Sequence, residues 1–278
     1  FGQALILHMH DDGRIRDRVR FYANFLEVMA FRTPCAALIV HDDGSRGDLV
    51  AKRLGAPPDR LHFWRDGVDI PSVDNDAAGG EFRRQLGCAP DAVVAMSIGR
   101  LSPEKNLERV VAAFASAAAR VPALHLVFVG DGPSRGEIEA QAARAGVIDR
   151  VRFAGRLTRD ALGPVFAAAD FVVSASARTN MTNAVIEAMA YGVPCVAVNS
   201  GSTAAVVRHE RTGLLVDGQS DRSIAEAMRR LATDKELRKS LGDNAREFVA
   251  DEFERVEERL AREVDLVISI ARGAGGRS

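Results

Sequence analysis

The sequence predicts an α/β protein built on a doubly wound parallel sheet. Short apolar runs recur along the chain without the polar alternation of half-exposed strands, as in residues 92–98 and 124–129. Runs of this kind are typical of strands buried on both faces, and amphipathic stretches of helical length separate them. Because a helix between two such strands makes a crossover, the strands are expected to be parallel. A composition of 47% hydrophobic and 27% charged residues fits a globular protein.

The alternation is most regular from residue 92 onward. The apolar runs predict strands over 92–98, 124–129, 151–153, 171–174, 195–198 and 213–216. The amphipathic stretches predict helices over 107–120, 135–145, 160–169 and 184–191. After Asp221 the pattern is helical throughout, and it ends in a charged helix over about 253–270. These elements make up the larger of the domains expected from the sequence.

The first 70 residues predict a smaller piece of the same kind. Strands are expected over 4–7, 36–40 and 60–63, and helices over 18–30 and 48–54. These units are too few for an independent domain, and residues 69–80, with Pro71 and a Gly-Gly pair, are interpreted as a linker. We therefore expect an incomplete first domain over 1–70, a second domain over 71–250, and a final helix and tail over 251–278. A chain that begins with Phe1 is expected to be cut from something longer.

Charge and cysteine usage exclude several classes of function. The 37 basic and 38 acidic residues give a net charge of -1, so no global field would hold a nucleic acid. The cysteines Cys35, Cys88 and Cys195 are far apart and odd in number, which argues against a disulfide framework and a zinc site. No apolar run approaches 18 residues, and no signal peptide pattern begins the chain. A cytoplasmic protein with reduced thiols is expected.

In open parallel sheets, ligands bind beyond the carboxyl ends of the strands, so the loops there are the candidate sites. The first loop, residues 99–106, carries Arg100 and Lys105 just before a helix. Lysine is rare here, with Lys52, Lys105, Lys235 and Lys239 alone among 37 cationic residues. Arginine and lysine both bind phosphate, which favours a phosphate site. A solvated loop with a Ser-Pro-Glu helix start is the alternative interpretation.

Two further loops contain glycine at or just after the end of a strand. Residues 130–133, with Gly132, form a turn into a helix that permits close approach of the backbone to a ligand. The strand over 151–153 leads to Gly155 and Arg156, where exposed backbone groups could contact a nucleotide base. An ordinary turn and an ordinary strand exit explain these residues equally well.

The fourth loop, residues 174–194, is the most specific. A strand ends in small residues, a polar loop follows, and a helix is expected to begin near Asn183 and stop at Gly-Val-Pro. Its free backbone N–H groups would face the same crevice as Arg100 and Lys105. Glu187, beside apolar neighbours, is interpreted as a cleft carboxylate that accepts hydrogen bonds from sugar hydroxyls. A first-turn acid that stabilises the helix dipole is the alternative.

Taken together, these loops resemble the family 4 (group 1) retaining glycosyltransferases of the GT-B fold, which use nucleotide-sugar donors. The resemblance covers essentially the whole chain, and its motifs occur in order. They are Ser-Ile-Gly-Arg-Leu-Ser-Pro-Glu-Lys-Asn at 97–106, Phe-Val-Gly-Asp-Gly-Pro at 128–133, the run 183–194, Thr-Gly-Leu-Leu-Val at 212–216, Asp-Gly-Val-Asp at 66–69, and His10-Asp11.

The resemblance implies roles for individual residues. It implies that Arg100 and Lys105 bind the donor diphosphate and assist its departure, and that Glu187 binds the ribose. It implies that the amides near Asn183 and Ala184 cradle phosphate. The remaining donor-binding residues are Gly132, Gly155, Arg156 and Thr179, of which Gly155 and Arg156 would contact the base. No metal is expected, because cationic side chains and a helix dipole offset the charge of the leaving diphosphate.

The resemblance also implies a catalytic histidine and a division of labour between domains. His10 would steady the donor sugar or the acceptor, although a lone histidine at a strand end is more often structural and His8 competes for the role. The first domain would be the acceptor side and the second the donor side, with the final helix crossing back to the first domain. The family's first domain carries roughly another hundred residues upstream.

The chain departs from the family pattern at two places. Thr179 stands where the family usually has a glutamate eight positions before Glu187, and residues 200–205 are small where a second acid is expected. These departures leave the donor-sugar contacts open. They support an alternative function, a non-catalytic GT-B-like subunit that binds nucleotide or a protein partner. A sugar-nucleotide epimerase, which shares the architecture, is a third alternative that fits the Arg100, Lys105 and Glu187 pattern less well.

The expected function is that of a hexosyltransferase acting in glycan biosynthesis. It would transfer a sugar with retention from a nucleoside diphosphate to a glycan, lipid or small-molecule hydroxyl. Peripheral contact with the inner face of the membrane through Arg14, Arg16, Arg18 and Arg20 is left open. Such an arginine cluster is more often a solvated helix face.

Overall fold

The chain divides into two compact units in the computed structural model. One consists of Phe1–Val68 with Phe253–Ser278, and the other of Asp69–Glu252. The structure describes residues 5–7, 29, 33–42, 47–69, 76–158, 161–176, 183–218 and 220–275. The helix expected over 18–30, His8, His10, Thr179 and the arginines at 14–20 lie outside the described residues, apart from Met29.

The larger unit contains a six-stranded sheet in the order β6-β5-β4-β7-β8-β9, with every pair of neighbours parallel. Its strands are β4 (Val93–Ile98), β5 (Leu124–Val129), β6 (Val151–Gly155), β7 (Phe171–Ser174), β8 (Cys195–Val198) and β9 (Gly213–Val216). The predicted doubly wound parallel sheet is confirmed. The strand order reverses between β4 and β7, which makes their carboxyl ends the topological switch point where ligands bind in such sheets.

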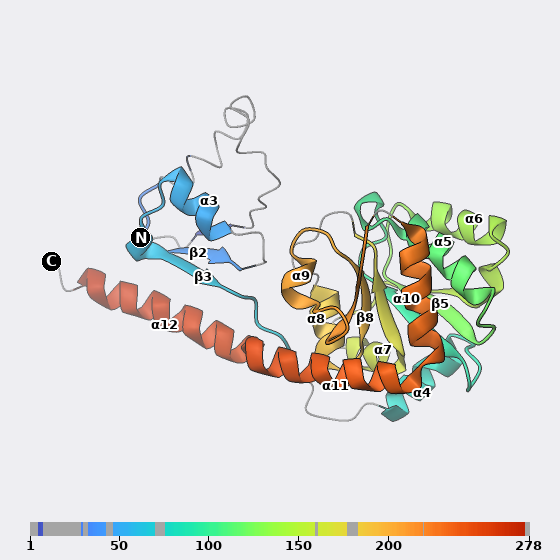
Figure 1. Cartoon of the computed structure of the whole chain (residues 1–278). Coiled ribbons are helices and arrows are strands. Elements are labelled where there is room, and N and C mark those ends of the chain that lie inside the picture. The colour runs from blue at the N-terminus through green and yellow to red at the C-terminus, as the bar shows by residue number, and fades with distance from the viewer. Residues whose placement is uncertain are drawn as a thin grey trace. The chain divides into compact units, whose positions relative to one another are not determined.

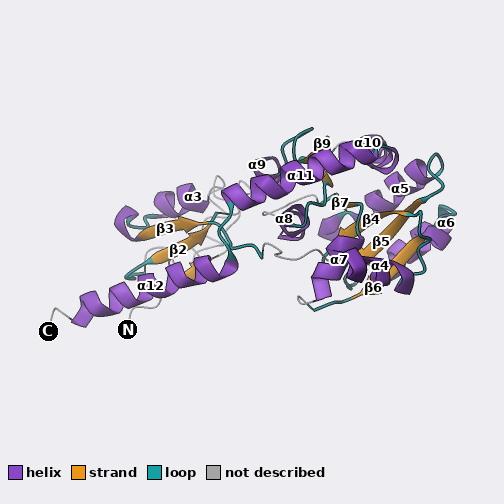
Figure 2. Ribbon diagram, turned by 90° about the horizontal axis from the view of Figure 1, so that it is seen from below, coloured by secondary structure: helices purple, strands orange, loops and turns teal. Residues whose placement is uncertain are grey.

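Helices cover both faces of this sheet (Figures 1 and 2). They are α4 (Asp76–Gln85), α5 (Leu107–Ala118), α6 (Arg135–Arg144), α7 (Leu162–Ala168), α8 (Asn183–Ala190), α9 (Thr203–Val206), α10 (Asp221–Thr233) and α11 (Lys235–Glu252). Helix α5 packs on α6 and α10, while α4 packs on α7 and α8 packs on α11. The strands between these layers are apolar on both sides because both sides are buried, and Phe128 and Phe171 are fully enclosed.

One expectation from the sequence is wrong in this unit. Residues 76–80, interpreted as part of a linker, form the first half of helix α4. The Gly-Gly pair does not break the helix, because Gly79 lies against α7. A Cβ atom at Gly79 would lie only 2.6 Å from the carbonyl carbon of Ala167, so the glycine allows the two helices to touch. The short helix α9 was also not expected.

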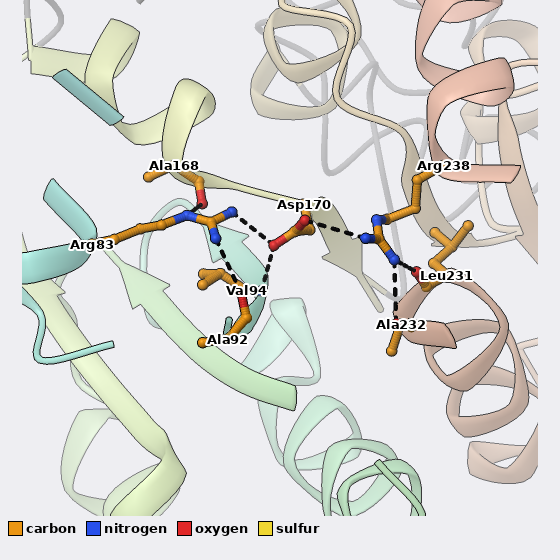
Figure 3. A network of polar contacts seen from close by, with 8 residues as sticks. All are labelled: Arg83, Ala92, Val94, Ala168, Asp170, Leu231, Ala232 and Arg238. Carbon is orange, nitrogen blue, oxygen red and sulfur yellow. Dashed lines mark hydrogen bonds and ion pairs between the residues drawn. The ribbon is translucent and has the colours of Figure 1, made fainter. Parts of the chain in front are cut away.

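A polar network joins the amino ends of β4 and β7 to the helices around them (Figure 3). Asp170 Oδ2 accepts hydrogen bonds from Arg83 Nη2 at 2.7 Å and from the Val94 N–H at 2.8 Å. Arg238 Nη2 lies 3.6 Å from the other carboxylate oxygen. Both arginines also donate to main-chain carbonyl groups: Arg83 to Ala92 and Ala168, and Arg238 to Leu231 and Ala232.

The smaller unit contains a three-stranded parallel sheet in the order β1-β2-β3. Its elements are β1 (Leu5–Leu7), β2 (Leu38–His41), α3 (Gly47–Leu54), β3 (Leu61–Trp64) and the C-terminal helix α12 (Val256–Gly275). The strands lie close to the predicted ranges, and α3 packs on one side through Val50, Ala51 and Leu54.

The C-terminal helix α12 is fastened to the end of β3. The guanidinium groups of Arg259 and Arg262 lie 4.7 and 4.2 Å from the ring centroid of Trp64. Arg259 Nε also donates to the carbonyl oxygen of Arg65 at 2.8 Å. No helix in the described part of the chain is both long enough and apolar enough to span a bilayer.

Candidate functional site

A solvent-open pocket with about 390 Å³ of free space lies at the switch point of the larger sheet. One wall is the end of β4 and the loop that follows it, and the other is the end of β7 with the first residues of α8. Its lining residues are Ser97, Ile98, Gly99, Arg100, Leu101, Lys105, Leu107, Val172, Val173, Ser174, Ala175, Ser176, Ala184 and Val185. The sheet topology therefore brings together Arg100, Lys105 and Ala184, three of the predicted site residues.

The two cations of this pocket have no carboxylate partner among the residues that the structure describes. Arg100 is exposed and Lys105 half-buried, and neither forms an ion pair within the described part of the chain. The carboxylate between them, Glu104, accepts a hydrogen bond from Ser102 Oγ instead. This bond, followed by smaller contributions that include the charges of Lys105 and Arg100, holds the pKa of Glu104 below its usual value. The pocket wall thus presents net positive charge that an anionic ligand would offset.

The loop that carries these cations rests on the glycine-rich turn after β5. The Leu101 N–H donates to the carbonyl oxygen of Asp131 at 3.1 Å, and the Leu101 oxygen accepts from the Ser134 N–H at 3.0 Å. A Cβ atom at Gly132 would lie 2.3 Å from that same Leu101 oxygen. The close backbone approach expected at Gly132 is therefore made to the cation-bearing loop, and Gly132 does not line the pocket.

Gly155 ends the edge strand β6 and Arg156 follows it, and neither residue lines the pocket. Gly155 has a φ of +72°, and its carbonyl oxygen accepts a hydrogen bond from the Gly130 N–H at 2.8 Å. Nothing lies within 4 Å of the position where a Cβ atom would stand at Gly155. Arg156 is exposed and makes no ion pair with any residue that the structure describes.

Helix α8 begins at Asn183, as expected, and directs its amino end toward the pocket. Ala184 and Val185 line the pocket, whereas Asn183 and Glu187 do not. Glu187 is half-buried one turn into the helix. Burial, followed by the carboxylates of Asp69 and Glu187, raises the pKa of Tyr191.

Sequence reasoning missed two contacts that shape the pocket. Asn106 Nδ2 donates to the carbonyl oxygen of Ala175 at 3.0 Å and joins the two pocket walls. Ser200 Oγ donates to the carbonyl oxygen of Ser176 at 2.6 Å, so the small residues after β8 support the end of β7. The signal for Asn106 was its place at the end of the Ser-Pro-Glu-Lys turn, where a left-handed residue is expected to be Asn or Gly. Nothing in the sequence indicated which residue Ser200 contacts.

The site brings together groups that bind phosphate. Across the described residues, no three His, Cys, Asp or Glu side chains come together in a way that could hold a metal ion. What the pocket combines is an arginine, a lysine and the amino end of a helix, and each of these groups favours an anion.

Comparison with known proteins gives this geometry a context. The model of the family described as glycosyl transferases group 1 matches residues 80–248. A GDP-mannose-dependent α-(1-6)-phosphatidylinositol monomannoside mannosyltransferase of Mycobacterium tuberculosis is 34% identical over 208 residues, which is 71% of this chain and 53% of that protein. The lipopolysaccharide core biosynthesis glycosyltransferase LpsE of Rhizobium meliloti is 32% identical over 76% of this chain and 67% of its own length.

Solved structures are similar in fold. HepE of Anabaena, in complex with UDP and glucose, has a TM-score of 0.77 at 22% identity over 95% of this chain and 72% of its own. Sucrose-phosphate synthase of Thermosynechococcus elongatus has a TM-score of 0.76 at 24% identity, over 97% of this chain and 68% of its own. The chain spans about half the length of the mycobacterial relative.

Proposed function

Because the chain belongs to the group 1 glycosyl transferases, we propose that it binds a nucleoside diphosphate sugar in the pocket between β4 and β7 and transfers the sugar to an acceptor hydroxyl with retention. The fold is of the GT-B type. The observation that carries the proposal is the pair Arg100 and Lys105, which share one pocket and have no carboxylate partner among the described residues. A diphosphate supplies the negative charge that this pair lacks.

Arg100, Lys105 and the amino end of α8 would each bind the diphosphate in a different way. The guanidinium of Arg100 holds two phosphate oxygens at once, while the ammonium of Lys105 acts as a point charge. The amino end of α8, which reaches the pocket through Ala184, adds free N–H groups and a partial positive charge. Together they neutralise most of the charge of a diphosphate without a metal ion.

The nucleoside is assigned to the side of the sheet that leads toward β6. Gly155 lies two strands from β4, about 10 Å away at the usual strand spacing. That distance suits a base whose diphosphate lies at Arg100. Gly155 has open space where a side chain would stand, and Arg156 beside it is exposed. Glu187, one turn into α8, is assigned to the ribose hydroxyls.

In the proposed reaction, the bond between the anomeric carbon and the diphosphate oxygen breaks, and the electron pair leaves with the diphosphate. Arg100 and Lys105 stabilise the charge that develops on the leaving oxygen. The acceptor oxygen forms its bond to the anomeric carbon on the same face of the sugar, and its proton passes to the leaving phosphate. His10 would steady the sugar or the acceptor during this step.

The relatives suggest which ligands to test. The mycobacterial relative is named for GDP-mannose, and HepE has been solved with UDP, so both guanine and uracil nucleotides are candidates. The acceptor would be a glycan, a lipid or a small molecule. The reaction is assigned to the cytoplasm, where the free thiols of Cys35, Cys88 and Cys195 stay reduced.

The test is a thermal-shift titration with UDP, GDP, ADP and dTDP, because a ligand that binds the folded state raises its apparent stability. We expect one of them to stabilise the wild type and Arg211→Ala, which removes an exposed arginine outside the pocket lining. Arg100→Ala is expected to abolish the shift. Equal affinity in Arg100→Ala would refute the phosphate site, and no shift with any nucleotide in a folded protein would refute the donor function.

A non-catalytic subunit is the second candidate, and Thr179 in the place of a glutamate favours it. The variant Thr179→Glu separates the two functions. A rise in donor hydrolysis or transfer would indicate an enzyme weakened at this position. Unchanged activity, with nucleotide binding retained, would favour the subunit.

A further inference from the structure

Asn106 has an unusual backbone conformation at the rim of the pocket. It lies between the 3₁₀ turn Pro103–Lys105 and helix α5, with φ 49° and ψ 44°. This is the left-handed region, which is costly for residues with a side chain and is visited mainly by Gly, Asn and Asp. Strained residues of this kind persist only where the surrounding structure holds them, and they gather at functional sites.

The side chain of Asn106 also does not cap helix α5. Asparagine is among the best residues at the N-cap, the position just before the first helical residue, where its side-chain oxygen accepts a hydrogen bond from an N–H group of the first turn. Asn106 makes no such bond to α5. Its Nδ2 group instead donates to the carbonyl oxygen of Ala175, a residue 69 positions later in the chain, at 3.0 Å. Asn106 thus has a left-handed backbone and makes no capping hydrogen bond to α5. Its side chain forms the long-range hydrogen bond to Ala175 instead.

This contact spans the pocket wall to wall. Asn106 stands between Lys105 and Leu107, which line one wall, and its acceptor Ala175 lines the other. At its opposite end, the cation-bearing loop is fixed by main-chain bonds between Leu101 and the turn after β5. Among the described residues, the loop is therefore held at both of its ends, and the contact nearer to Lys105 is made by the amide of Asn106.

We propose that Asn106 is a positioning residue that clamps the loop of Arg100 and Lys105 to the end of β7, so that both cations face the pocket before a diphosphate arrives. The proposal rests on the proposed function of the pocket. Lysine and arginine have long flexible stems, so the backbone sets where their charges can reach. Without the clamp, the loop would spend part of its time in other orientations, and the apparent affinity would fall by that fraction.

Three variants separate the clamp from the backbone conformation. Asn106→Gly keeps the left-handed conformation at no steric cost but removes the amide. Asn106→Asp keeps the size and shape, but its carboxylate cannot donate to the carbonyl of Ala175. Asn199→Gly is the control, because this exposed asparagine after β8 makes no side-chain hydrogen bond within the described residues.

The first measurement needs no ligand. Hydrogen exchange over residues 99–106 is expected to speed up at least tenfold in Asn106→Gly and Asn106→Asp but not in Asn199→Gly. Lys105 is one of only four lysines, so its acylation rate can be followed by mass spectrometry beside that of Lys239. We expect a faster reaction at Lys105 alone, with the unfolding temperature of Asn106→Gly within about 2 °C of the wild type.

The second measurement uses pyrophosphate, which is independent of the base, together with UDP and GDP. Both Asn106 variants are expected to bind pyrophosphate about tenfold more weakly, and the affinity should depend less on salt because the cations no longer converge. Unchanged exchange and unchanged affinity would overturn the proposal. If the wild type binds none of the three ligands, the proposed function fails, and the loop exchange alone decides whether Asn106 is a clamp.

Discussion

Asp170 Oδ2 accepts a hydrogen bond from Arg83 Nη2 at 2.7 Å, and it accepts another from the Val94 N–H at 2.8 Å (Figure 3). Asp170 immediately precedes β7, and Val94 is the second residue of β4, so one carboxylate joins the amino ends of the two central strands. The carboxyl ends of these same strands form the pocket, where Asn106 joins their loops. The switch point is therefore held at both ends.

The variant Asp170→Asn is expected to lower the free energy of unfolding by about 2 kcal/mol, the usual range for hydrogen bonds to a charged group. The carboxylate faces two guanidinium groups, from Arg83 and Arg238, and its side chain is only 19% exposed. An amide cannot offset their charge. Urea unfolding followed by circular dichroism measures the change.

Glu81→Gln is the matched control, because Glu81 also pairs with an arginine, Arg84, but both side chains are more than half exposed. Solvent screens such a pair, so no measurable change is expected. A loss at Asp170 no larger than that at Glu81 would show that the network contributes nothing specific.

The adjacent glycines of α4 are expected to respond oppositely to alanine. Alanine normally stabilises a helix interior by about 1 kcal/mol relative to glycine. At Gly80 the nearest atom to an added Cβ is the end of the Arg84 side chain at 4.0 Å, so Gly80→Ala should gain that stability. At Gly79 the Cβ would meet the main chain of Ala167 at 2.6 Å, so Gly79→Ala should separate α4 from α7 and destabilise the protein by about 1–3 kcal/mol. Thermal unfolding of the two variants measures the difference. Equal shifts in their unfolding temperatures would contradict the close packing of Gly79 against Ala167.

We expect the folded protein to lose stability in mild acid because of His125. Burial, followed by the charges of Arg152 and Arg150, lowers the pKa of His125 below its ordinary value of 6.5. Below pH 6.5 the unfolded chain therefore binds a proton that the folded protein resists, and stability falls as the pH falls. The variant His125→Gln removes this contribution, so between pH 7 and pH 5.5 its unfolding free energy should rise relative to that of the wild type.

The contribution of His41 to stability changes with pH in the opposite direction, so His41 must be present in both proteins of that comparison. Its Nδ1 lies 2.5 Å from Asp66 Oδ1, and this hydrogen bond is the main cause of its raised pKa. The stability from His41 is present below pH 6.5 and is lost as the pH rises through its folded pKa. Because both proteins contain His41, its effect cancels when His125→Gln is compared with the wild type at each pH. Parallel pH curves would show that His125 does not titrate as argued.

The sequence could predict the sheet because a strand buried on both faces leaves a continuous apolar run, as in β4 and β5. It could also predict that Arg100 and Lys105 meet the start of α8, since carboxyl ends of parallel strands share one edge. It could not predict α4, because Gly79 and Gly80 resemble a break until Ala167 is known to lie against them. The bond of Asn106 to Ala175 was equally hidden, because only the folded sheet brings these loops together.

The variant Gly132→Ala is expected to weaken diphosphate binding without removing any ligand contact. Its Cβ would lie 2.3 Å from the Leu101 oxygen, so the loop that carries Arg100 must shift by several tenths of an ångström or more. Gly136→Ala, four residues later in α6, is the matched control, because nothing lies within 4 Å of its added Cβ. We expect pyrophosphate affinity to fall about tenfold in Gly132→Ala and to stay unchanged in Gly136→Ala, as measured by calorimetry. Equal affinity in both variants would show that the turn after β5 does not set the position of the cations, and the anchor at Leu101 would then have no role in binding.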